Sequence, residues 1–76
     1  MDTHPTRSLN NHELDGAIER YWVLSRRKAE HPRRAAQRAE LGRLLRESFR
    51  RGRGERHWAR RLNTSPYRIR LAAVGA

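Results

Sequence analysis

The sequence contains no cysteine, and this absence excludes disulfide bonds, thiolate metal ligands and cysteine nucleophiles together. Large apolar residues are also scarce, because Leu, Ile, Val and Phe together provide only 13 of the 76 residues. A chain this short and this poor in aliphatic side chains builds one small core at most. Trp22 and Trp58 must therefore supply a large share of the buried apolar area.

Long apolar runs are missing as well. The longest ones, Trp22–Leu24 and Leu71–Val74, are far shorter than the core of a signal peptide or a membrane span. We therefore expect a soluble cytoplasmic protein, in the nucleoid or in a host cytoplasm, with no membrane partner.

Lysine and the acidic residues are few, whereas arginine is abundant. Seventeen arginines and Lys28 face eight acids, for a net charge of +10. Residues 1–25 carry a net charge of −2 and residues 26–76 a net charge of +12. Such a polycation is expected to bind phosphate or an acidic protein surface. The arginine excess has two explanations that stay open, namely bidentate phosphate binding and the codon usage of a high-GC genome.

The first helix is predicted over residues 11–29. Asn10 and Glu13 have the spacing of a capping box, and Leu9 can pack against Leu14. Apolar and small residues then recur at helical spacing from Leu14 through Ser25, with Trp22 and Leu24 beside this stripe, while Val23 falls on the far side. Residues 1–9 are expected to form a flexible tail.

A second helix is predicted from Pro32 to Arg51, because proline is favoured in a first helical turn. Its apolar stripe consists of Leu41, Leu44, Leu45, Ser48 and Phe49, with arginines on the opposite side. The two helices should form an antiparallel hairpin over residues 10–51. The glycines of Gly52-Arg53-Gly54 indicate either a turn or a fragment of an RNA-binding Arg-Gly tract.

Residues 55–75 have the pattern of a helix-turn-helix. A short helix with Ala59 and Leu62 precedes Asn63, which tolerates the left-handed conformation of a tight turn. Thr64 or Ser65 can cap the next helix, with Pro66 as its first residue, and Ile69 should face the preceding helix. The whole chain is thus expected to be an all-α domain of three or four helices, with residues 10–76 forming one domain.

The same residues resemble the C-terminal end of a family of short bacterial proteins of unknown function. The shared positions are Trp58, Leu62, Ser65 and Val74-Gly75. The chain departs from the family at His57, where an aromatic pair is usual, and at Leu71-Ala72-Ala73, where Ala-Val is usual. The resemblance implies a helix-turn-helix-like fold and carries over no activity or site residue.

These patterns favour a small transcription-type regulator that binds nucleic acid, DNA ahead of RNA, mainly through phosphate contacts. An apolar strip made of Tyr67, Leu71 and Val74 should be buried against the second helix or against another molecule. In a homodimer, the second copy of the chain would cover this strip. The predicted nucleic-acid-binding residues lie in the basic part of the chain: Arg43, Arg46, Arg50, Arg53, Arg60, Arg61, Tyr67, Arg68 and Arg70.

The alternative is an adaptor or inhibitor, of the kind that phages encode, which binds a protein complex that acts on nucleic acid, such as RNA polymerase. Its protein-binding residues would be Tyr21, Trp22 and Val23 on the acidic first helix. A structural protein of a larger particle fits the composition as well.

An enzyme is not expected. The four histidines are scattered, and Gly16 stands where the second histidine of a His-Glu-x-x-His zinc motif would be required. No glycine-rich phosphate loop is present, and the glutamates are explained by capping and by arginines three or four residues away. We therefore predict no catalytic residue, no metal and no cofactor.

Overall fold

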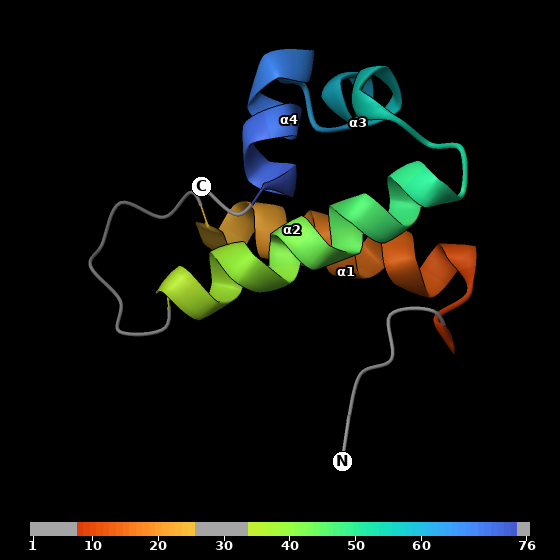
Figure 1. Cartoon of the computed structure of the whole chain (residues 1–76), viewed down its shortest axis with the longest axis horizontal. Helices are drawn as coiled ribbons and strands as arrows, with labels where there is room; N and C mark the ends of the chain where they lie inside the picture. The colour runs from red at the N-terminus through yellow and green to blue at the C-terminus, as the bar shows by residue number, and fades with distance from the viewer. Residues whose placement is uncertain (1–7, 26–33, 75–76) are drawn as a thin grey trace.

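The computed structural model describes residues 8–25 and 34–74, with four helices and no strand in those ranges. The helices are α1 (Asn11–Ser25), α2 (Arg34–Arg50), α3 (Glu55–Arg61) and α4 (Pro66–Ala73). Helix α2 runs back alongside α1, and α3 and α4 lie together on one side of this pair (Figure 1). The predicted all-α class is confirmed.

Helix α1 begins as predicted. The Asn10 backbone N–H donates to Glu13 Oε1 at 2.9 Å, and the Glu13 N–H donates to Asn10 Oδ1 at 2.8 Å, which completes a capping box. Leu9 is partly buried and packs against the core beside this cap. The expected flexible tail over residues 1–9 falls mainly on residues 1–7, which lie outside the described residues, as do the predicted helical residues 26–29.

Helix α2 places its apolar stripe as predicted, since Leu41, Leu44 and Leu45 are buried. Its described part begins at Arg34, and the expected start at Pro32 lies outside the described residues. The helix ends in a Schellman motif. Gly52 adopts a left-handed φ of 92°, the Gly52 N–H donates to Phe49 O, and the Arg53 N–H donates to Ser48 O, each at 3.0 Å. This assigns Gly52 a role as a helix terminator.

The core lies between the helical pair and the α3–α4 pair. Trp58 is fully buried and its indole N–H donates to Ser48 Oγ at 2.8 Å, which connects α3 to the last turn of α2. The buried apolar residues come from all four helices: Leu14, Ile18, Trp22, Leu41, Leu44, Leu45, Trp58, Ala59, Ile69 and Ala73.

The apolar strip of α4 differs from the expectation of burial against the second helix. Tyr67 is 63% exposed, Leu71 40% and Val74 68%. The reason is the orientation of α4, which turns Ile69 and Ala73 toward the core and leaves the strip on the opposite side. Ala73 and Ala72 instead make the close approach to α2, at Gly42.

Candidate nucleic-acid interface

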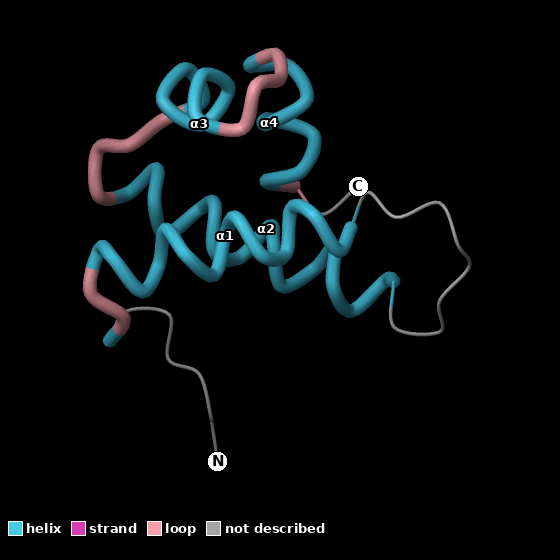
Figure 2. The backbone as a smooth tube through the Cα atoms, turned by 180° about the vertical axis from the view of Figure 1, so that it is seen from behind, coloured by secondary structure: helices cyan, strands magenta, loops and turns pink. Residues whose placement is uncertain are grey.

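The connection between α3 and α4 has a defined hydrogen-bonding pattern. Asn63 has a φ of 56°, its N–H donates to Arg60 O at 3.4 Å, and the Thr64 N–H donates to Ala59 O at 2.8 Å. These bonds form a second Schellman motif, with asparagine in the left-handed position that glycine usually takes. Figure 2 shows the resulting reversal between the two short helices.

Helix α4 begins at the residue that the sequence indicates. Ser65 is extended and its side chain accepts the Arg68 backbone N–H at 3.3 Å, while Pro66 takes the first helical position. The turn and cap fix which residues of α4 face inward. Ile69 and Ala73 are buried, whereas Tyr67 and Arg68 are exposed to solvent.

Most of the predicted phosphate-binding arginines are already bound to carboxylates. Each of the five arginines concerned lies within 4 Å of an acidic side chain. The pairs are Arg43 with Glu40, Arg50 with Glu47, Arg53 with Asp15, Arg61 with both Asp15 and Glu19, and Arg70 with Glu55. The short spacings of Glu40–Arg43 and Glu47–Arg50 were predicted from sequence, and both pairs form.

Asp15 joins separate elements, a role that its place near a helix start does not reveal. Its Oδ2 atom accepts from Arg53 in the α2–α3 connection and from Arg61 Nη1 on α3 at 3.4 Å. Arg61 also donates from Nε to Glu19 Oε2 at 2.6 Å, and its guanidinium lies 5.5 Å from the centre of the Trp58 ring. Arg53 and Arg61 therefore connect the α2–α3 connection and α3 to α1 through ion pairs.

Two carboxylates titrate below their usual range because of these arginines. Hydrogen bonds from Arg50 and then from Arg51 lower the pKa of Glu47 to about 2. A bidentate contact with Arg70, at 2.9 and 3.0 Å, lowers the pKa of Glu55. Both side chains therefore stay ionised well below neutral pH, and their arginines stay paired.

Arg46 has a structural contact of another kind. Its Nη1 atom donates to the carbonyl oxygen of Ala73 at the end of α4. A cation at the C-terminus of a helix stabilises the unpaired carbonyl groups there. This predicted phosphate ligand therefore anchors α4 to α2.

The remaining two predicted arginines, Arg60 and Arg68, form no ion pair or side-chain hydrogen bond with the described residues. Arg56 is in the same state, and sequence reasoning missed it. Arg56 and Arg60 lie one helical turn apart and share the exposed face of α3. With Arg68 they provide three exposed guanidinium groups on α3 and α4, and the exposed Tyr67 is next to Arg68 in the sequence. No sequence signal separates Arg56 from Arg61 and Arg70, which also lack an acidic residue four positions away on their own helices and yet pair with other elements.

The predicted protein-binding residues do not form one exposed surface. Val23 is 59% exposed, as predicted, and Tyr21 is half-buried. Trp22 is only 9% exposed and belongs to the core. This burial agrees with the expectation that Trp22 supplies a large share of the buried apolar area.

Residues 8–25 and 34–74 contain neither a cluster of metal-ligating side chains nor a helix able to span a membrane. No group of three or more histidine, aspartate or glutamate side chains there could hold a metal ion. None of the four helices has the length and hydropathy that crossing a membrane requires, over the part of the chain that is described.

Comparison of the chain with protein-family models, with curated protein sequences and with solved structures gave no match. The resemblance of residues 55–75 to short bacterial proteins therefore stays a prediction. Function has to be inferred from the geometry of the chain itself.

Proposed function

We propose that this chain is a small basic regulator that binds nucleic acid through phosphate contacts from arginines around a helix-turn-helix-like unit, α3–α4. The observation that carries the proposal is the presence on these two helices of exposed guanidinium groups that have no ion pair with the described residues: Arg56, Arg60 and Arg68. An unpaired guanidinium binds a phosphate without first giving up a carboxylate. Binding should therefore begin at this face.

The turn supports the helix-turn-helix interpretation. Four residues separate α3 from α4, which is the usual length of such a turn. Ala59 is small and 5% exposed at the inner side of α3, and Ile69 is fully buried on α4. The same arrangement in DNA-binding proteins leaves one side of the second helix free for the major groove.

The side chains of α4 favour DNA over RNA. Tyr67 is 63% exposed and Arg68 is next to it, so an aromatic ring and a planar guanidinium project from the start of the helix. The major groove of B-DNA, about 12 Å wide, admits a helix, whereas that of A-form RNA is too narrow for side chains to read. Arg68 is accordingly our candidate for contact with a guanine edge.

The test compares two double variants that lose the same charge. Arg56→Gln with Arg60→Gln removes the unpaired arginines of α3, and Arg20→Gln with Arg43→Gln removes exposed arginines of α1 and α2. Fluorescence anisotropy with a labelled duplex would give Kd at NaCl concentrations of about 50 to 200 mM. We expect the first variant to bind about tenfold more weakly and to lower the slope of log K against log salt by about 1.8.

The control variant should bind nearly as the wild type does. Equal weakening of both variants would contradict the proposed interface, because affinity would then follow net charge alone. Circular dichroism establishes that both variants are folded before affinities are compared.

We infer adaptor activity as a second candidate, because Val23 is a large apolar side chain with 59% exposure on α1. The acidic character of α1 supports it less than expected, since Asp15 and Glu19 are paired with arginines of this chain. Co-elution with purified bacterial RNA polymerase after nuclease treatment, and its loss in Val23→Asp, would support the adaptor. Absence of co-elution with the wild type would contradict it.

A further inference from the structure

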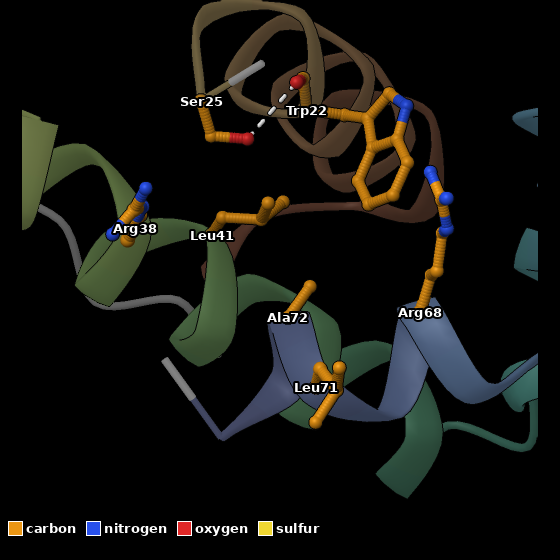
Figure 3. Close-up of a pocket in the computed structure, with 7 residues that line it drawn as sticks. All are labelled: Trp22, Ser25, Arg38, Leu41, Arg68, Leu71 and Ala72. Atoms are coloured by element: carbon orange, nitrogen blue, oxygen red, sulfur yellow. Dashed lines mark hydrogen bonds between the residues drawn. The ribbon is translucent and has the colours of Figure 1, made fainter. Parts of the chain in front are cut away.

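A pocket lies between the end of α1, the first half of α2 and the α4 residues Arg68, Leu71 and Ala72. Its volume is about 280 Å³. Figure 3 shows Trp22 and Ser25 of α1 on one side, Leu41 of α2, and Leu71 and Ala72 of α4 on the other. The apolar part of the wall thus combines a large indole ring with aliphatic side chains.

The charged groups of the pocket are both cationic. Arg38 and Arg68 line it from opposite sides in this view, and no acidic side chain of residues 8–25 and 34–74 does (Figure 3). Neither guanidinium has an ion pair with the described residues, although most other arginines of the C-terminal region do. The hydroxyl group of Ser25 donates to Trp22 O at 3.0 Å, so its proton is already used. The pocket therefore offers hydrogen-bond donors on the arginines, and the part of the chain that the structure describes provides no carboxylate to pair with them there.

The volume is just below the range of about 300–1,000 Å³ that is usual for ligand pockets. It suits a molecule with one ring or a short branched chain. We propose that this pocket binds a small organic anion, with its apolar body against Trp22, Leu41 and Leu71 and its carboxylate on Arg68, with Arg38 at the opposite rim. Such a ligand would match both the apolar wall and the unpaired donors.

Because of the position of Arg68, an anion bound in the pocket should affect the binding of nucleic acid. The same guanidinium lines the pocket and belongs to the proposed nucleic-acid interface. A carboxylate bound to it competes with phosphate, so the ligand would lower affinity for nucleic acid. This consequence rests on the proposed function, whereas binding of the anion to the pocket does not.

The direct test is an NMR titration of the full chain with 3-phenylpropionate. A ligand of about eleven non-hydrogen atoms in a small open pocket should bind with a Kd of about 1 mM. We expect saturable shifts at the indole N–H of Trp22 and the methyl groups of Leu71. The indole N–H of Trp58, which is fully buried and bonded to Ser48, serves as an internal reference and should not shift.

Charge is tested with the neutral analogue and with variants. 3-Phenylpropionamide should bind about tenfold more weakly than the acid, because it lacks the charge-assisted contact. Arg68→Gln should weaken binding of the acid about tenfold and leave binding of the amide unchanged. Arg43→Gln, on the exposed face of α2 outside the pocket, should change neither.

Three results would overturn the proposal. They are the absence of saturable shifts at Trp22, equal binding of the acid and the amide, and equal weakening by Arg43→Gln and Arg68→Gln. Arg38→Gln provides a second variant if Arg68→Gln is unfolded, and it should also weaken binding of the acid. Failure of duplex binding in the anisotropy experiment would leave the titration unaffected, which separates the two proposals.

Discussion

Ser48 is a polar side chain in the apolar face of α2, and its hydroxyl group accepts the indole N–H of Trp58 at 2.8 Å. Both side chains have 0% exposure. A buried donor without an acceptor costs about 1–3 kcal/mol. We therefore predict that Ser48→Ala lowers the free energy of unfolding by about 2 kcal/mol, measured by urea denaturation with the tryptophan signal.

The double variant Ser48→Ala with Trp58→Phe is the control for this prediction. It removes the indole donor together with its acceptor, so the N–H group of residue 58 is no longer left unpaired, whereas the weak bond from the Ser48 hydroxyl to Arg53 O, at 3.4 Å, is lost in both variants. The two substitutions should be less destabilising together than the sum of their separate effects. Strict additivity would show that the hydrogen bond does not contribute.

Glu47 provides a prediction about pH at the same scale. Its pKa is lowered from 4.5 to about 2 by Arg50 and Arg51, so the folded state holds the proton more weakly than the unfolded state does. The contribution of this carboxylate to stability is fully present above pH 4.5. It is lost as the pH falls from 4.5 through about 2.

We expect the melting temperature to fall over that interval in wild-type protein. Glu47→Gln should be less stable at neutral pH and should show a smaller loss on acidification. Thermal denaturation followed by circular dichroism at stepped pH values measures both. An identical pH profile for the variant would contradict the role of Glu47.

At the scale of elements, helix ends were the most predictable feature. The Asn10–Glu13 capping box, the left-handed Asn63 and the Ser65–Pro66 start of α4 all form as the sequence indicates. Each depends on residues within a few positions of one another, so the local sequence contains the necessary information.

Contacts between elements were less predictable for a physical reason. Helical periodicity shows which face of a helix is buried, but it does not show which side chain of another helix will lie opposite. Arg61 pairs with Glu19 across 42 positions, and Arg53 pairs with Asp15 across 38. Within the predicted phosphate-binding set, sequence alone therefore could not separate the arginines that pair with carboxylates from Arg60 and Arg68.

Gly42 illustrates a contact between elements that can be tested. A Cβ atom at this position would lie 3.0 Å from Ala72 O and 3.1 Å from Ala73 O, because the end of α4 approaches α2 there. Alanine normally stabilises a helix by about 0.5–1 kcal/mol over glycine. At Gly42 we predict the opposite sign, a loss of about 1 kcal/mol, because backbone oxygens must move away.

Gly16 is the matched control, because it is also helical and a Cβ atom there meets nothing within 4 Å. Gly16→Ala should raise the free energy of unfolding by about 0.5–1 kcal/mol. Urea denaturation measures both substitutions. If Gly42→Ala stabilised the protein as much as Gly16→Ala does, the backbone of α4 would not approach α2 closely enough at Gly42 to exclude a Cβ atom.

For the whole molecule, the balance between net charge and ion pairs decides how stability depends on salt. The chain carries a net charge of +10, and its principal extents are 35 × 33 × 18 Å. At about 10 mM salt the Debye length is about 30 Å, so nearly all charges interact and the repulsion dominates. At about 150 mM salt the length is about 8 Å, and close pairs such as Glu47–Arg50, at 2.6 Å, persist while distant repulsion is screened.

Raising NaCl from about 10 to 150 mM should therefore increase the melting temperature, by about 5 °C if screening contributes about 1 kcal/mol. The variant Arg56→Gln with Arg60→Gln lowers the net charge from +10 to +8 without breaking an ion pair among the described residues, so its increase should be smaller. A melting temperature that falls with NaCl would mean that the ion pairs outweigh the repulsion. The arginine excess would then stabilise the fold by itself, and the case for a phosphate partner would lose its energetic basis.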